Sequence, residues 1–223
     1  NLALALQAAG WKVGLMDGDV YGPNIPIMLG VDEEARPDVS EAEKLIPVEA
    51  HGLKMISMGV LVPKNQPMVW RGPMLHSAVQ QFLGKVEWGE LNCLVVDLPP
   101  GTGDVQLSLA QSVSVSGAVL VTTPQEVSVA DTRKAILMFH QMKVPVLGLI
   151  ENMTGDIFGR GGGAGAAAEF KIPFLGEIPL DSNIRKGSDN GEPVVVSAAE
   201  NNSAKAFLEI AEKIQASLEA LKV

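Results

Sequence analysis

The sequence predicts an α/β fold in which helices cover both faces of a mostly parallel sheet. Three continuous apolar runs, at 91–98, 117–123 and 144–150, have the length and composition of strands that are buried on both faces. Segments rich in helix formers separate these runs, and such alternation is typical of a parallel sheet. The 223 residues are 47% hydrophobic and 19% charged, which predicts a packed core.

The elements follow in a regular order along the chain. Residues 1–10 are typical of the second half of a helix that ends at a glycine, and residues 12–19 predict a short strand followed by a loop. Residues 21–50 are rich in proline, glycine and acidic groups and predict an irregular segment. The other expected elements are strand 53–61, helix 73–88, strand 91–98, helix 105–113, strand 117–123, helix 128–142 with Ser128 as N-cap, strand 144–150, strand 174–180 and helix 203–221.

Charge and cysteine content narrow the class of protein. The chain has 26 acidic and 17 basic residues, a net charge of −9, which argues against broad binding to nucleic acid or to anionic membranes. The single cysteine, Cys93, cannot form an intrachain disulfide, and we expect a buried, inert thiol. No apolar run approaches the roughly 18 residues of a membrane span. We therefore expect one cytoplasmic domain over residues 1–223 that binds neither nucleic acid nor membrane.

Two acids follow the first strand. In open parallel sheets, ligands bind at the carboxyl ends of the strands, so the residues after each strand are the most informative. Asp17 and Asp19 are carboxylates one residue apart, and such a pair can bind Mg²⁺ through water or orient a water for attack. Aspartate and glycine are also common turn residues. The local sequence leaves a solvated turn and a functional site both open.

A third acid closes an apolar run in LVVDLPPGTGD, residues 94–104. A strand would hold Asp97 rigidly, as the Mg²⁺-binding acid of a nucleotide site requires. Gly101 and Gly103 would let the backbone approach a phosphate and move when the phosphate leaves. The alternative is an ordinary strand-to-helix loop with Asp104 as N-cap. The pattern of four apolar residues, an acid and a proline–glycine loop favours the nucleotide site.

Polar residues also follow the later strands. Thr122 and Thr123, with Asp131 and Arg133 in the next helix, would face a nucleotide or a partner subunit, or would form a solvated first turn. Asn152 can read a purine edge through paired hydrogen bonds, or it is a turn residue.

The glycine-rich run GRGGGAG, residues 159–165, does not match the phosphate-loop pattern G-x-x-x-x-G-K-[ST]. We expect a flexible surface loop with Arg160 exposed. The three histidines are scattered without metal-ligand spacing, and the three tryptophans are expected to be packing residues.

Taken in order, these motifs resemble one family of ATPases. The chain is similar to the Mrp/ApbC group, which belongs to the deviant-Walker P-loop class that includes MinD and ParA. The resemblance covers essentially the whole chain and implies a Rossmann-like P-loop NTPase fold. It also implies a homodimer with ATP and Mg²⁺ between the subunits, and a role in carrying iron–sulfur clusters to apo-protein clients. The matching motifs are VGLMDGDVYGPNIPIMLG, MVWRGPM, LVVDLPPGTGD, TTPQEVSVADTRKA, GLIENM, DIFGRGGG and FLGEIPLDSNIRKGSDNGEPVV.

The resemblance implies roles for individual residues. Asp19 would orient the attacking water and Asp97 would be the switch II acid, so these two are the expected catalytic residues. Asp17 and Asp97 would support Mg²⁺ through water. Asp131 would lie on a helix that faces the phosphate loop and the dimer partner. The nucleotide-binding residues implied by the resemblance are Asp17, Gly101, Thr102, Gly103, Asn152, Pro179, Leu180 and Asp181.

The sequence departs from the family pattern in two places. The phosphate loop GKGGVGKS/T is absent, and residues 1–10 match the remainder of the helix that follows it in the family. We therefore expect the first strand and this loop to be missing, ATP hydrolysis to be weak or absent, and the neighbouring strand edges to be exposed. Many family members place Cys-x-x-Cys between the ENM and DIFG motifs. Here residues 153–156 leave no room for it, so no iron–sulfur ligands are evident.

Three functions remain open on the sequence. The first is an ATP-dependent iron–sulfur assembly or transfer factor, which the whole-chain resemblance favours. The second is a ParA/MinD-like positioning ATPase without cluster binding. The final helix alternates lysine and glutamate and is not a basic amphipathic helix, which disfavours the second function. The third is a nucleotide-free structural remnant.

Overall fold

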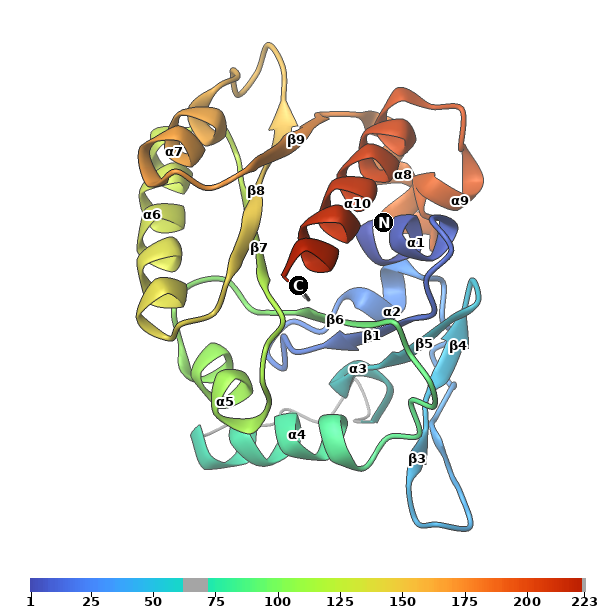
Figure 1. The fold of residues 1–223 in the computed structure, drawn as a ribbon. Helices are drawn as coiled ribbons and strands as arrows, with labels where there is room; N and C mark the ends of the chain where they lie inside the picture. The colour runs from blue at the N-terminus through green and yellow to red at the C-terminus, as the bar shows by residue number, and fades with distance from the viewer. Residues whose placement is uncertain (62–71, 222–223) are drawn as a thin grey trace.

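The computed structural model describes residues 1–61 and 72–221. Two sheets form its centre, with strand orders β4-β5-β1-β6 and β7-β8-β9, and the pair β2-β3 stands apart (Figure 1). All neighbours in the two central sheets run parallel except β4 and β5. The strands are β1 Val13–Asp17, β2 Asp38–Val39, β3 Leu45–Ile46, β4 Val48–Ala50, β5 Leu53–Ile56, β6 Cys93–Asp97, β7 Ala118–Thr122, β8 Val146–Thr154 and β9 Phe174–Pro179.

Helices lie on both sides of the second sheet. Figure 1 shows α6 and α7 against one face of β7 and β8, and α10 against the other, where α10 also contacts α1 and β9. The predicted α/β architecture is therefore confirmed. The helices are α1 Leu2–Ala8, α2 Ile25–Met28, α3 Met58–Leu61, α4 Gly72–Gly84, α5 Asp104–Ser112, α6 Glu126–Gln141, α7 Gly162–Phe170, α8 Ser182–Asn190, α9 Val194–Ser197 and α10 Asn202–Ala220.

Two apolar clusters hold these layers together. The larger one joins α1, α10 and the strands, and includes Leu4, Met55 and Ile210, each at most 4% exposed. The smaller one lies under α6 and α7 and includes Ile136 and Leu149, both fully buried. Each such side chain contributes about 1.5–3 kcal/mol when it leaves water. The clusters thus fix the strands whose carboxyl ends carry the predicted site.

Four predictions about the bounds of elements were wrong. The strand expected at 53–61 ends at Ile56, because the Ser57 side chain turns inward and accepts the Gly59 N–H, and α3 follows. The helix expected at 73–88 ends at Gly84, after which Val86 pairs with Leu45 in an isolated bridge. The segment 21–50, expected to be irregular, contains α2 and the short strands β2 to β4.

The fourth wrong prediction concerns the start of α6. The helix begins at Glu126 with Gln125 as its N-cap, two residues before the expected start. The Ser128 hydroxyl does not cap the helix, because it accepts the N–H of Thr123 in the preceding turn. Residues 68–71 of the MVWRGPM motif, including Trp70, lie outside the described residues.

Two strands that were expected to be buried on both faces are only half-buried. Within the described residues, β6 ends one sheet and β7 begins the other, and both line a cavity of about 850 Å³. No residue of β6 is buried, and the Val121 side chain in β7 is 57% exposed. Cys93 is half-buried rather than buried, for the same reason. By contrast, β8 is buried over most of its length, as predicted.

Candidate functional site

The acids that close β1 and β6 lie side by side. Asp17 and Asp97 are the final residues of adjacent parallel strands and are paired in register. The N–H of Gly18 donates to the backbone oxygen of Asp97 at 2.7 Å. A Cβ at Gly18 would lie 2.9 Å from that same oxygen, so glycine is required for the close approach. The DGD motif therefore fixes two carboxylates at one carboxyl edge of the sheet, where ligands bind in such folds.

Asp17 is an organised, buried acid. Its side chain is 1% exposed, and its Oδ2 accepts the Ser57 hydroxyl at 2.8 Å. Its Oδ1 accepts the backbone N–H of Asp19 at 3.1 Å. Burial raises the pKa of Asp17 to about 6, although both hydrogen bonds act in the opposite direction. Asp17 is therefore not a solvated turn residue.

Asp19 forms the turn that follows. Its Oδ1 accepts the backbone N–H groups of Tyr21 at 3.2 Å and Gly22 at 3.1 Å, as in an Asx turn. Asp19 is therefore a turn residue, as one of the two interpretations predicted. Its negative charge nevertheless affects the carboxyl of Asp97 at the end of β6. Packing around the Asp97 carboxyl raises its pKa, and the negative charge of Asp19 raises it further.

The three carboxylates create local negative potential that a cation would relieve. Asp17 is buried and has a raised pKa, which means that its charged form is under-solvated. The pKa of Asp97 is also raised, although this residue is exposed at the end of β6. Among the residues that the structure describes, no group of three His, Cys, Asp or Glu side chains is arranged to hold a metal ion alone. A divalent cation here would need water or a bound phosphate to complete its ligands.

The loop after Asp97 is fastened by Gln106, which sequence reasoning missed. The buried Gln106 amide donates to the backbone oxygens of Pro99 at 2.8 Å and Gly101 at 3.1 Å. Its Oε1 accepts the N–H of Gly103 at 3.0 Å. Gly101 has φ of +95°, a conformation that favours glycine, while Thr102 is exposed. Gly103 has no side chain for a full capping box, but a glutamine three residues after an N-cap is half of that signal and could have identified Gln106.

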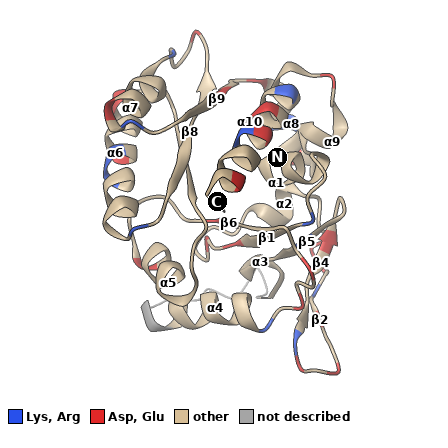
Figure 2. Cartoon of the chain, in the orientation of Figure 1, with Lys and Arg blue, Asp and Glu red and all other residues tan. Residues whose placement is uncertain are grey.

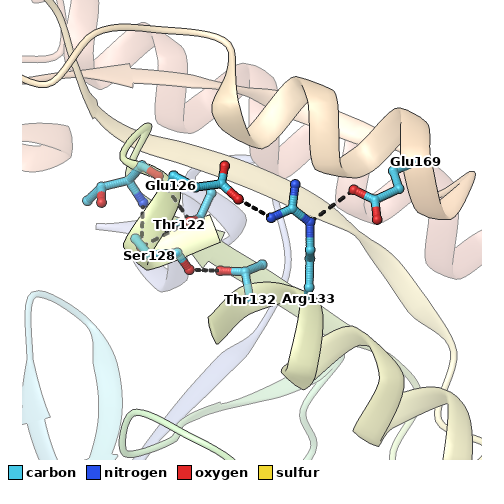
Figure 3. A network of polar contacts seen from close by, with 7 residues as sticks. Thr122, Glu126, Ser128, Thr132, Arg133 and Glu169 are labelled. Atoms are coloured by element: carbon cyan, nitrogen blue, oxygen red, sulfur yellow. Dashed lines mark hydrogen bonds and ion pairs between the residues drawn. The ribbon is translucent and has the colours of Figure 1, made fainter. Parts of the chain in front are cut away.

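Hydroxyl groups close the turn between β7 and α6 (Figure 3). The Ser128 and Thr122 hydroxyls share a hydrogen bond at 3.0 Å, and Ser128 Oγ accepts the N–H of Thr123 at 3.1 Å. One turn further along α6, the Thr132 hydroxyl donates to the Ser128 backbone oxygen at 3.0 Å. The three hydroxyl groups therefore form hydrogen bonds within the turn and hold α6 against the end of β7.

Charged residues of α6 pair with neighbours. Arg133 bridges Glu126 at 2.5 Å and Glu169 of α7 at 2.9 Å, and this double pairing raises the pKa of its guanidinium (Figure 3). Asp131 pairs with Lys134 at 2.9 Å one turn away and is 71% exposed. Arg133 therefore joins α6 to α7, whereas Asp131 remains on the surface of α6.

The second group of predicted residues lies at the ends of β8 and β9. Asn152 is paired with Ile178 in register, and its Oδ1 accepts the N–H of Met153 at 3.0 Å. Met153 has φ of +60° and the register shifts between Asn152 and Thr154, so β8 has a bulge directly after Asn152. The Leu180 N–H donates to the backbone oxygen of Thr154 at 2.9 Å. The structure thus brings Asn152 and the 179–181 loop to one edge of the second sheet.

Asp181 has two partners that belong to the fold. Its Oδ1 accepts the N–H of Asn183 at 2.8 Å and caps α8, and its Oδ2 accepts the Ser203 hydroxyl of α10 at 2.7 Å. These hydrogen bonds lower the pKa of Asp181, first through Asn183 and then through Ser203. Asp181 is therefore held in position by hydrogen bonds to the helices α8 and α10.

The glycine-rich run is a helix start rather than a flexible loop. Glu151 is fully buried at the end of β8, where its Oε1 accepts the N–H of Gly161 at 2.7 Å and its Oε2 accepts the N–H of Gly163. α7 begins at Gly162, so the carboxylate sits at the positive end of this helix. The prediction of flexibility was wrong because it overlooked Glu151, a charged residue within an apolar strand. Arg160 is exposed as predicted and pairs with Glu177 at 2.6 Å.

The predicted residues therefore form two groups on two sheets. Asp17, Asp19, Asp97 and the loop 101–103 share the edge of β1 and β6. Asn152 and the loop 179–181 share the edge of β8 and β9, while Asp131 lies on the surface of α6, which packs on β7 and α7. The cavity between β6 and β7 separates the groups.

A family comparison matches nearly the entire chain. Residues 1–215 fit the model of the ParA family described as NUBPL iron-transfer P-loop NTPase. The chain belongs to this family. A Synechocystis relative named iron–sulfur cluster carrier protein is 50% identical to this chain, over 96% of this chain and 64% of the relative. The Deinococcus radiodurans relative of the same name is 52% identical, over 95% and 62%.

A plant relative and solved structures agree with this family. The Arabidopsis thaliana mitochondrial iron–sulfur protein required for NADH dehydrogenase is 46% identical over 100% of this chain and 74% of its own length. A nucleotide-binding protein from Archaeoglobus fulgidus, solved with ADP, is 38% identical with a TM-score of 0.76 over 92% of this chain and 83% of that one. MinD of Pyrococcus furiosus is 23% identical with a TM-score of 0.72 over 96% and 90%, which supports the fold alone.

These findings confirm the predicted family and the P-loop NTPase fold class. They favour the iron–sulfur carrier interpretation over the positioning ATPase, because the curated relatives carry the former name. The chain spans a little under two thirds of the length of the two bacterial relatives. No helix among the described residues is long and apolar enough to cross a membrane.

Proposed function

We propose that this chain is the nucleotide-responsive domain of a protein that carries iron–sulfur clusters to apo-proteins. The observation that carries the proposal is the pair Asp17 and Asp97, closing adjacent strands in a family of P-loop NTPases. Relatives at about half identity are named iron–sulfur cluster carriers, which supports the cargo. Residues 1–223 act as a single domain in this proposal.

Asp17, Asp19 and Asp97 would have different roles at a bound nucleotide. Asp17 and Asp97 would hold Mg²⁺ through water, because their carboxylates lie at one strand edge and both have raised pKa values. Asp19 would orient the attacking water. Bound Mg²⁺ would supply charge neutralisation at the phosphates. Gly101, Thr102 and Gly103 would respond to the terminal phosphate, because Gln106 fastens the loop on its inner side and leaves Thr102 exposed.

The base would be held at the second sheet. Asn152 would present its amide to the adenine, with Pro179 and Leu180 beside the ring. Asp181 would contribute by fixing this loop, since both its oxygens already have partners. These 223 residues contain no G-x-x-x-x-G-K-[ST] motif. Backbone amides of that motif provide most phosphate binding in such enzymes, so we expect weak or absent ATP hydrolysis by this chain.

The cargo is tested by anaerobic reconstitution with ferrous iron and sulfide. The proposal predicts an absorption band near 400 nm, roughly where thiolate-ligated clusters absorb, that decays when an apo-ferredoxin is added. A Cys93→Ser variant shows whether the single thiol of the chain is a ligand. Absence of the band in the unmodified chain, with or without nucleotide, would remove cluster binding from this chain.

A further inference from the structure

Two glycines outside the proposed site meet at the ends of two helices. Gly30 follows α2 and closes the motif VGLMDGDVYGPNIPIMLG, and Gly191 is the C-cap of α8 in the motif FLGEIPLDSNIRKGSDNGEPVV. A Cβ at Gly191 would lie 2.2 Å from the Cα of Gly30, and a Cβ at Gly30 would lie 2.9 Å from the Gly191 backbone oxygen. Their φ angles are +65° and +70°. The two backbones are therefore in direct contact, and neither position has room for a side chain.

The end of α8 is also held from the first sheet. His51 lies in the turn between β4 and β5, and its Nε2 donates to the Gly191 backbone oxygen at 3.0 Å. The Glu192 N–H donates to the Gly187 backbone oxygen at 2.8 Å and closes the last turn of α8. Because packed backbones cannot pass through one another, a displacement of this end of α8 acts on Gly30.

The other end of α8 carries the base loop, residues 179–181, which is proposed to hold the base. Asp181 caps the first turn of α8, and its Oδ1 accepts the Asn183 N–H at 2.8 Å. The nine residues of α8 span about 14 Å at the usual helical rise. α8 therefore joins the base loop directly to the contact between Gly30 and Gly191.

The helix α2 depends on its neighbours for its position. It has four residues and no side-chain cap, and a single helical turn is not stable alone. α2 packs against α8 and α3. The Ile25 N–H at its start bonds to the Asp17 carboxyl. Asp19 closes the turn before α2 by accepting the N–H groups of Tyr21 and Gly22. The position of α2 therefore affects both acids that follow β1.

We propose that the contact between Gly30 and Gly191 couples the base loop to the acids Asp17 and Asp19. A purine at the base loop restricts α8, α8 restricts α2 through the two glycines, and α2 restricts the turn of Asp19. Restricted motion alone is enough to couple two sites in this way. By linkage, a cation that orders the acids raises the affinity for the base. This inference rests on the proposed function, which places the base at residues 179–181.

The test is hydrogen exchange with adenosine, which carries the base but no phosphate. Met153 and Leu180 report on the base site, because their amides lie beside Asn152 and in the base loop. Tyr21 and Gly22 report on the turn of Asp19. We expect adenosine to slow exchange at all four amides by at least about threefold, as local ordering would.

Gly191→Ala should break the coupling, because the added methyl group has no room beside Gly30. Gly10→Ala is the matched control: φ is +92° there, and no atom from elsewhere in the described chain lies within 4 Å of an added Cβ. Both variants carry backbone strain, but only the first has a clash. We expect Gly191→Ala to lose the response of the Asp19 turn and to keep the response of the base site, and Gly10→Ala to keep both.

Gly30→Ala is a milder second variant, since its Cβ would meet only the edge of Gly191, and it should reduce the response of the turn in part. A response at the base site without one at the turn in the unmodified chain would overturn the coupling and leave the proposed function standing. So would an equal response of the turn in Gly191→Ala and Gly10→Ala. Absence of any response at Met153 and Leu180 would instead overturn the proposed base site, and the coupling with it.

Discussion

Burial of Asp17 makes the folded chain sensitive to pH. The pKa of this carboxyl is about 6 in the folded chain, above its ordinary value of 3.8. Between about pH 4 and pH 6 the folded chain retains a proton that the unfolded chain has released. The free energy of unfolding therefore falls as pH rises through this window. The shift corresponds to about 3 kcal/mol that is fully lost above pH 6.

An Asp17→Asn variant should remove this pH dependence. We expect the variant to unfold at higher urea concentration than the unmodified chain at pH 7.5, because no buried charge remains, and at a similar concentration near pH 4. Asp38→Asn, on the exposed strand β2, is the matched control and should follow the unmodified chain throughout. A constant difference between Asp17→Asn and the unmodified chain from pH 4 to 7.5 would contradict the burial argument.

For single residues, the sequence predicted which acids end the strands, but not the side chains that form hydrogen bonds around them. Asp97 could be predicted because a lone acid closes an apolar strand. Ser57 could not, because its hydrogen bond to Asp17 joins residues 40 positions apart and depends on the pairing of β1 with β5. Glu151 was missed because its partners, the amides of Gly161 and Gly163, belong to a loop that local sequence describes as flexible.

The helix α7 depends on one buried carboxylate. Glu151→Ala would leave the N–H groups of Gly161 and Gly163 without their charged acceptor, and hydrogen bonds to charged groups contribute about 1.5–3 kcal/mol each. We expect a loss of roughly 3 kcal/mol in the free energy of unfolding and faster hydrogen exchange across residues 159–165.

Glu169→Ala is the matched control within the same helix. Glu169 pairs with Arg133 on the surface and is about half exposed, so its removal should cost at most about 1 kcal/mol. Exchange in residues 159–165 should stay slow in this variant. Equal effects of the two substitutions on stability and exchange would show that Glu151 does not organise the loop.

Element order was predictable, while several ends and burial patterns were not. Long apolar runs predicted the strands β6, β7 and β8, and an apolar stripe at helical spacing predicted α10. Both predictions succeed because hydrophobic periodicity indicates which side chains are buried. The half-burial of β6 and β7 depends on whether a neighbouring strand lies beside them, which an apolar run does not reveal. The start of α6 was predicted wrongly because the Ser128 hydroxyl accepts the N–H of Thr123 instead of capping the helix.

The whole molecule presents exposed apolar side chains where the strands of the second sheet end. Val127 is 80% exposed, Ile157 75% and Leu180 45%, and they follow β7, β8 and β9 respectively. Figure 2 shows that both acidic and basic residues occur along the helices α6 and α10. We propose a homodimer that buries this apolar edge.

A dimer of this kind should weaken when charge enters the apolar edge. We expect Val127→Glu to shift the molecular mass measured by light scattering from dimer toward monomer, because a buried unpaired charge is costly. Val39→Glu, at a site 65% exposed on β2, should leave the mass unchanged. A monomer mass for the unmodified chain at all concentrations, with or without nucleotide, would contradict the proposed homodimer.

We expect the edge formed by Asp17, Asp19 and Asp97 to respond to a nucleotide's terminal phosphate. Hydrogen exchange of residues 97–104 with Mg²⁺ and millimolar nucleotide tests it most directly. We expect slower exchange with a non-hydrolysable ATP analogue than with ADP, and loss of this difference in Asp97→Asn but not in Asp38→Asn. Equal exchange with both nucleotides, or an unchanged difference in Asp97→Asn, would contradict it.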